Sequence, residues 1–269
     1  MNFGNVMDEL NHVDNPDVLE RMKTIPALHE ALLISRPQNW WGTGLKPEVL
    51  FDIANHDGIP VVRVPSSAIL LELVAVPGRQ ARMAILLLHR QEILNDCKVA
   101  ISDCDDPWVA DTCALTGAAI AAYEAGYHEA AMALAVSVGE PLATWTSIPR
   151  VQAFRSETAQ EDWERYCRQR GVSKYRWAAL ELSNDRDQFA LPHNWHYKAL
   201  IAPIPRFFTP WSPASGRPLP ESLSRHVVAH QPTRQHFSPE NALLALMLAT
   251  SLLCDAQERA EEVRGMDGE

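Results

Sequence analysis

The sequence predicts a mainly α-helical protein, built as a helical bundle with a mixed amino-terminal cap and a long insertion before the last pair of helices. Three observations predict this fold class. Residues 242–254 are nearly all apolar or small, residues 106–138 combine many alanines with helical spacing, and residues 66–103 carry apolar side chains at helical intervals. With 269 residues and 46% hydrophobic content, the chain can bury a substantial core.

The first 66 residues are expected to form the cap, to which we assign a regulatory role. Prolines and turn signals interrupt short helical patterns in this region. One short strand is expected at "IPVVRV", residues 59–64. The bundle domain then covers residues 67–262, and a charged tail, 263–269, follows it.

Long helical patterns begin at Ser66, which can cap the first of them together with Ser67. The first part of the bundle is expected to hold helices over about 68–76, 79–103 and 106–125, with a renewed helical pattern from Gly126 to Val138. The many alanines allow close helix packing, so this part should lie in the middle of the bundle.

Residues 141–218 form the expected insertion. Helices are predicted within it over about 159–170 and 174–182. Its proline-rich end, "APIPRFFTPWSPASGRPLP", is expected to lie extended over a surface, because proline removes backbone donors and disfavours helix.

The last two helices follow the insertion. A short helix is expected from Pro220, a favoured first-turn residue, to His230, because Pro232 forbids its continuation. The final helix should start with Ser238 as its N-cap and Pro239 as its first residue. Its apolar run should be buried on most of its circumference, at a bundle centre or at a dimer interface.

Charge is distributed unevenly along the chain. The net charge is −10, which argues against a protein that coats nucleic acid, since a large phosphate footprint needs positive charge. Residues 1–149 hold 9 Lys and Arg against 19 Asp and Glu, whereas residues 150–240 hold 13 against 9. Contact with a phosphate backbone is therefore expected from the later half.

Cysteine usage and the longest apolar tract both favour a cytoplasmic protein without a membrane segment. The chain has 5 cysteines, no Cys-x-x-Cys pair and no signal-peptide pattern, so buried thiols in a reducing compartment are expected. The tract 68–88 is interrupted by charged residues and by Pro77-Gly78, which predicts two helices of a soluble domain in place of a membrane span.

The segment "RHVVAH", residues 225–230, is the strongest candidate for chemistry. Polar His226 follows Arg225, and His230 lies at the end of the predicted short helix. Cleavage of RNA by its own 2'-hydroxyl needs a proton-transfer group and a fixed positive charge near the phosphoryl oxygens. His230 suits the first task, since the negative end of a helix favours imidazolium, and Arg225 suits the second because a guanidinium can bind phosphate in bidentate fashion.

This pattern resembles the R-x4-6-H signature of the HEPN superfamily, helical-bundle proteins of which many are metal-independent endoribonucleases. The segment "AYEAGYHEAAMALAVSVGE" is similar to the mid-bundle helix of that family, and residues 206–253 also resemble a group of uncharacterised actinobacterial proteins. The HEPN resemblance implies an endoribonuclease of the toxin or antiphage kind that forms 2',3'-cyclic phosphate ends without metal or cofactor. It also implies a homodimer, with an antitoxin or regulatory protein as a further partner.

Helical spacing constrains such a site. Arg225 and His230 lie roughly 140 degrees apart around an ideal helix, whereas His226 and His230 share one face. We therefore expect a composite site, in which a two-fold dimer brings both copies of the motif to one cleft. Arg234 and His236, on the loop after His230, are expected to contact the neighbouring phosphate.

Alternatives remain open for the same residues. His226, His230 and His236 could hold a metal ion with water as the fourth ligand, although no acid or thiolate accompanies them. Arg225 could instead pair with a carboxylate, which would leave a non-catalytic dimerisation or partner-binding protein. The sequence contains no P-loop, G-x-S-x-G or G-x-G-x-x-G pattern to support other hydrolases or a nucleotide-binding function.

Overall fold

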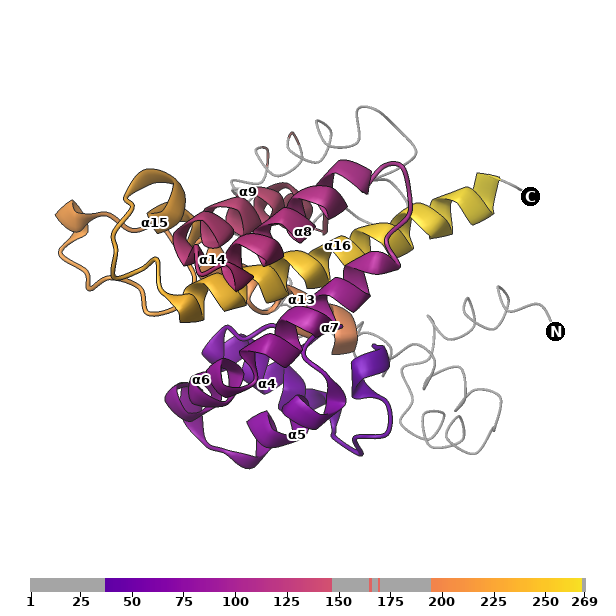
Figure 1. Ribbon diagram of the computed structural model, residues 1–269, viewed down its shortest axis with the longest axis horizontal. Helices are drawn as coiled ribbons and strands as arrows, with labels where there is room; N and C mark the ends of the chain where they lie inside the picture. Colours follow the sequence, from indigo (N-terminus) through magenta and orange to yellow (C-terminus); the bar gives the residue numbers. More distant parts are fainter. Residues whose placement is uncertain (1–36, 147–164, 166–168, 170–194, 268–269) are drawn as a thin grey trace.

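The computed structural model describes residues 37–146, 165, 169 and 195–267, and this part of the chain is helical without any strand (Figure 1). Its elements in chain order are η1 (Gln38–Trp40), α4 (Pro47–Asp57), α5 (Ser67–Ala75), α6 (Gly78–Leu88), α7 (Arg90–Ser102), α8 (Ala110–Glu124), α9 (His128–Thr146), α13 (Trp195–Ile201), α14 (Ile204–Phe207), η4 (Pro213–Ser215), α15 (Arg225–His230) and α16 (Pro239–Asp267). The predicted mainly α fold is confirmed.

Two predicted helices, over 159–170 and 174–182, lie outside the described residues apart from Arg165 and Gln169. The first 36 residues of the expected cap lie outside them as well. Within the described part of the chain, no helix is both long enough and apolar enough to cross a membrane.

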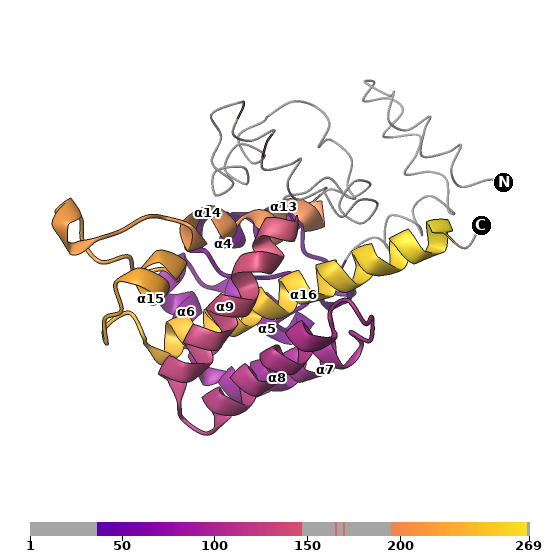
Figure 2. The same cartoon turned by 90° about the horizontal axis from the view of Figure 1, so that it is seen from above.

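Helix α16 is the central element of the bundle. Its residues 241–257 are all buried, and α9, α8 and α7 pack against it (Figure 2). Burial at a bundle centre is thus confirmed. The second expected reason for that burial, a dimer interface along the apolar run, is wrong because helices of the same chain already cover it.

The predicted start of α16 is also confirmed. The backbone N–H of Asn241 donates to Ser238 Oγ at 3.2 Å, which satisfies one of the amides that a helix start leaves unpaired. Pro239 is the first helical residue and Glu240 lies in the first turn, where the helix dipole favours a carboxylate.

The strand expected at residues 59–64 does not form. This segment is irregular and buried, and side chains replace a partner strand: Asn39 Nδ2 donates to Val61 O at 3.0 Å, and Trp40 Nε1 donates to the same oxygen at 2.8 Å. The N–H of Arg63 in turn donates to Asn39 Oδ1 at 3.0 Å. Hydrogen bonds with side chains of η1 therefore satisfy backbone groups of this buried segment that no neighbouring strand pairs.

The helix expected over 79–103 is two helices. It breaks at His89, which ends α6 and precedes α7 with φ −93° and ψ 16°. The His89 ring lies 3.1 Å from Glu72 Oε2 and 3.3 Å from Glu92 Oε1. The break lets α6 pack beside α5 and α4 while α7 runs along α16.

The expected insertion is shorter at both ends. Helix α9 continues through Pro141 to Thr146, so the helical core extends beyond the predicted start of the insertion. At the other end α13 packs against α4, and Phe207 of α14 is 1% exposed. The proline-rich end therefore contributes to the core as well as covering a surface.

The expected helix from Pro220 to His230 is confined to its second half. Residues 220–224 are not helical, and α15 begins at Arg225. Ser224 instead donates its hydroxyl to Thr209 O at 3.1 Å, which ties this segment to the residues after α14.

A buried ion pair holds the second half of α16. Arg259 is 2% exposed, and its Nε donates to Asp255 Oδ2 at 2.7 Å. Arg259 Nη2 also donates to Thr146 O at 3.3 Å, which links α16 to the end of α9. Helix α16 therefore extends beyond its apolar run.

We expect Arg259→Met to lower the free energy of unfolding by about 3 kcal/mol, because it leaves the buried Asp255 carboxylate without its cation. Urea unfolding followed by circular dichroism measures the change. Arg90→Met, at an exposed position of α7, should stay within about 0.5 kcal/mol of wild type. Equal stability of the two variants would contradict a role for the buried pair.

Candidate functional site

The candidate site is built on α15, a helix of six residues packed against α9. Val227, which is 0% exposed, anchors it to the core. The helix ends where the N–H of Gln231 donates to Val227 O at 3.0 Å, directly before Pro232. Only one and a half turns form, so Arg225 and His230 occupy the two ends of the same short element.

Arg225 and His230 meet within one chain. Arg225 Nη1 lies 3.3 Å from His230 Nε2. A guanidinium has only donors, so His230 Nε2 can take part in this contact only as an acceptor. The expected separation around the helix does not keep the two groups apart, because the long arginine side chain reaches along the helix axis.

Arg225 has two further partners: a carboxylate, which the sequence left open as an alternative, and an aromatic ring, which it did not indicate. Glu140, near the end of α9, places Oε2 3.4 Å from Arg225 Nη1, and the Arg225 guanidinium lies 5.8 Å from the centroid of the Phe208 ring. Only 14% of the Arg225 side chain is exposed, against 31% of the Glu140 side chain. The guanidinium is therefore held between a carboxylate, an aromatic face and an imidazole.

His226 and His230 share a face of α15, as the spacing predicts. Their ring centroids are 4.9 Å apart in an edge-to-face arrangement. Burial lowers the pKa of His226, and the neighbouring His230 and Arg225 lower it further. The lowered pKa favours the neutral form of His226 beside the permanently charged Arg225.

His236 does not lie where it could meet a phosphate. It is 1% exposed, and both of its nitrogens are engaged: the N–H of Ser224 donates to Nε2 at 3.2 Å, and Nδ1 lies 3.2 Å from Pro220 O. Its own carbonyl accepts a hydrogen bond from Asn241 Nδ2 at 3.0 Å. The expected phosphate contact of His236 is wrong; the residue joins the start of α15 to the start of α16.

Arg234, the other residue expected to contact a phosphate from this loop, is exposed to solvent and can be reached by a ligand. The three-histidine metal arrangement is not formed, because His236 is buried with both nitrogens bonded. Among residues 37–146, 165, 169 and 195–267, no group of three His, Cys, Asp or Glu side chains is placed to hold a metal ion.

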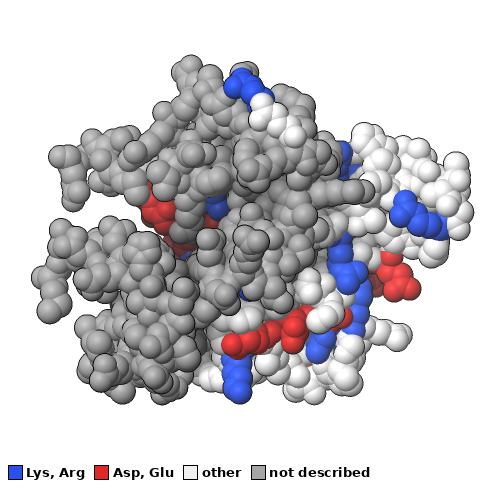
Figure 3. All heavy atoms as spheres, turned by 180° about the vertical axis from the view of Figure 1, so that it is seen from behind, with Lys and Arg blue, Asp and Glu red and all other residues white. Residues whose placement is uncertain are grey.

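Charges of both signs are interspersed on the face of the molecule opposite to that of Figure 1. Figure 3 shows this face, on which Lys and Arg side chains of the described residues lie directly beside Asp and Glu.

Comparison with known proteins adds no relative: no family model matches the chain, and neither a curated protein nor a solved structure matches it.

The bonding of His236 predicts a pH dependence of stability. Burial lowers its pKa, while its bonds to the backbone at Pro220 and Ser224 oppose the shift. The unfolded chain, with a histidine pKa of about 6.5, then binds more protons than the folded chain as the pH falls. The contribution of His236 to stability is therefore complete above about pH 6.5 and is lost as the pH falls towards its folded pKa.

We expect His236→Gln to be less stable than wild type by about 1–3 kcal/mol near neutral pH, because buried partners lose their bonds. This difference should shrink between about pH 7.5 and pH 5, since only wild type loses the His236 contribution. Urea unfolding across that range measures it. His56→Gln, whose side chain is 70% exposed in wild type, should keep the wild-type slope. A constant gap for His236→Gln would contradict the assignment.

Proposed function

We propose that this protein is a metal-independent endoribonuclease with an HEPN-like bundle, in which Arg225 and His230 act on one RNA phosphodiester. The observation that carries the proposal is the 3.3 Å approach of Arg225 Nη1 to His230 Nε2 at the end of a surface helix. Residue 230 is exposed, so RNA can reach the imidazole from solvent. The HEPN resemblance of the 225–230 motif supports the same activity.

The reaction follows from what the two groups can do. A phosphate oxygen that binds Arg225 replaces the Nε2 lone pair as the acceptor of the guanidinium proton. His230 Nε2 is then free to accept the proton of the ribose 2'-hydroxyl, whose oxygen attacks phosphorus. The fixed positive charge of Arg225 stabilises the negative charge that grows on the phosphoryl oxygens. The bond between phosphorus and the 5'-oxygen of the next nucleotide breaks, and that oxygen leaves as a hydroxyl after taking up a proton from solvent or from the protonated His230. One product fragment then ends in a 2',3'-cyclic phosphate and the other begins with a 5'-hydroxyl.

Neighbouring groups support these two roles. His226, adjacent to His230, can hydrogen-bond to the substrate in its neutral form, and Arg234 can contact the next phosphate from the loop. Glu140 holds Arg225 in place in the absence of RNA. An entering phosphate also carries negative charge and can bind a guanidinium in bidentate fashion, so it can compete with Glu140 for Arg225.

The proposed nuclease also requires a particular assembly and cellular location. We infer a homodimer that brings two α15 helices to one cleft, acting in the cytoplasm as a toxin or antiphage nuclease. An antitoxin or regulatory protein restrains it. The acidic first half of the chain suits a basic partner of this kind, because it carries more than twice as many acidic as basic residues.

A second function is favoured by one specific observation. Glu140 Oε2 lies 3.4 Å from Arg225, whose side chain is largely buried, and that is how a structural arginine is held. The same bundle would then act as a non-catalytic dimerisation or partner-binding protein. In that case substitution of Arg225 or Glu140 would change the stability of the protein. Substitution of Arg225 or His230 would have no effect on RNA cleavage.

We expect Arg225→Ala and His230→Ala each to reduce cleavage of a single-stranded RNA by about 100-fold or more, since each removes one catalytic group. Initial rates with a chelator present, and a chemical assay for cyclic phosphate ends, measure the effect. His56→Ala and Arg90→Ala remove the same side-chain types at exposed positions outside α15 and should cleave at the wild-type rate.

The outcomes separate the alternatives. If both site variants cleave RNA as wild type does while remaining folded and of the same oligomeric state, the nuclease proposal is wrong. If wild type shows no cleavage but Arg225→Ala and Glu140→Gln are destabilised, the binding protein is the better account. Loss of wild-type activity with the chelator alone would support a metal-dependent reaction.

A further inference from the structure

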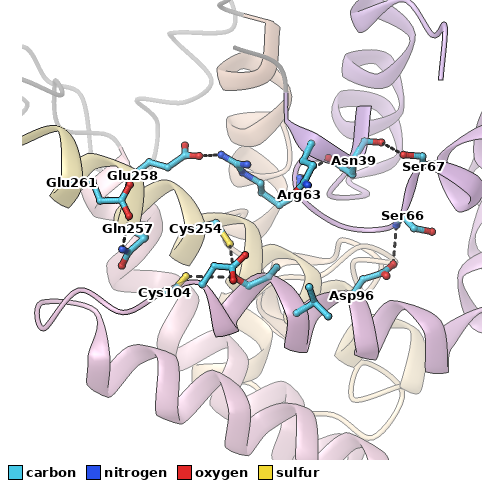
Figure 4. A pocket seen from close by; sticks show the side chains of 14 residues that line it. Asn39, Arg63, Ser66, Ser67, Asp96, Cys104, Cys254, Gln257, Glu258 and Glu261 are labelled. Atoms are coloured by element: carbon cyan, nitrogen blue, oxygen red, sulfur yellow. Dashed lines mark hydrogen bonds and ion pairs between the residues drawn. The ribbon is translucent and has the colours of Figure 1, made fainter. Parts of the chain in front are cut away.

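A pocket of about 500 Å³ lies between α7, α16 and the segment around Arg63 (Figure 4). Its described lining includes four carboxylates and one guanidinium, contributed by Asp96, Asp103, Glu258, Glu261 and Arg63. Arg63 pairs with Glu258. The lining is thus acidic as a whole, with three carboxylates in excess of what the single arginine can pair.

Two cysteines from different elements meet in the wall of this pocket. Cys104 follows the end of α7 and is 7% exposed, whereas Cys254 lies on α16 and is 8% exposed. Their sulfur atoms converge on one carbonyl: each Sγ lies 3.7 Å from Ala100 O (Figure 4).

We propose that Cys104 and Cys254 are a dithiol site that closes to an intramolecular disulfide by exchange with a small, positively charged disulfide entering the acidic pocket. The site is independent of the ribonuclease proposal. It rests on two thiols that share one acceptor, on their place in the pocket wall and on the charge of the lining.

The exchange balances in two steps. One protein thiol loses its proton to solvent, and its thiolate attacks one sulfur of the small disulfide to form a mixed disulfide. The other half of the small disulfide leaves and takes up a proton, which releases one small thiol. The second cysteine then loses its proton and attacks the mixed disulfide, expelling the second small thiol. Two protein thiols are oxidised to one disulfide, and one small disulfide is reduced to two thiols.

Burial and the neighbouring thiol determine the rate. The hydrogen bond with Cys254, followed by burial, raises the pKa of Cys104. The nucleophile is the thiolate, so exchange should be slow at neutral pH and faster as the pH rises. Once formed, the disulfide would join the α7–α8 connection to the middle of α16 and would restrict separation of these elements.

The test uses the full chain and cystamine, a disulfide with two ammonium groups, in the absence of RNA. After the remaining thiols are blocked, mass spectrometry of a non-reduced digest should show a peptide pair linked through Cys104 and Cys254. The melting temperature should rise by about 5 °C or more, because the cross-link closes a long loop. Reduction should reverse both changes.

Matched variants make the result specific. Cys104→Ser and Cys254→Ser should each stop at a mixed disulfide with one cysteamine. Cys113→Ser should still form the disulfide, although Cys113 lies nearby with its sulfur 3.3 Å from Ile101 O. No linked peptide, a link through Cys113, or a lasting mixed disulfide in wild type would overturn the proposal.

Charge selection is measured separately with bis(2-hydroxyethyl) disulfide, which is neutral. For each thiol, the rate with cystamine is divided by the rate with the neutral reagent. This ratio should be about threefold larger for the protein than for a short cysteine peptide, an excess that measures charge selection. This excess should fall at high salt and in Glu261→Gln. The same rate ratio for the protein and for the peptide would show that the dithiol does not select cationic disulfides.

Discussion

Burial of α16 is the constraint on which the rest of the structure depends. Residues 241–257 include no solvent-facing position, so every side of this length of helix must be covered by other elements. Each fully buried leucine contributes roughly 1.5–3 kcal/mol relative to an exposed one, which makes exposure of the run prohibitive. Helices α7, α8 and α9 are positioned by that requirement.

The candidate site follows from the same packing. Because α9 lies along α16, its end places Glu140 beside α15, which packs on α9. The start of α16 is tied to the start of α15 through His236, whose ring and carbonyl bond to Ser224 and Asn241. The candidate site on α15 thus depends on a buried helix and on the buried side chain of His236.

Buried polar side chains hydrogen-bond to core backbone groups and charges that regular secondary structure leaves unpaired. Asn39 and Trp40 satisfy the irregular segment before α5, and Arg259 satisfies Asp255 together with the carbonyl of Thr146. An unpaired buried polar group costs about 1–3 kcal/mol, so these contacts are required wherever irregular backbone or a charge enters the core.

Local signals in the sequence determined the helical class, the N-cap of α16 and the burial of its apolar run, because propensity, capping and periodicity act within a few residues. Tertiary structure decided the break at His89, the passage of α9 through Pro141, the burial of His236 and the meeting of Arg225 with Glu140. No glycine or proline marks the break, and Glu140 carries no spacing relation to Arg225. These features depend on contacts between segments far apart in the chain, which only close packing around α16 brings together.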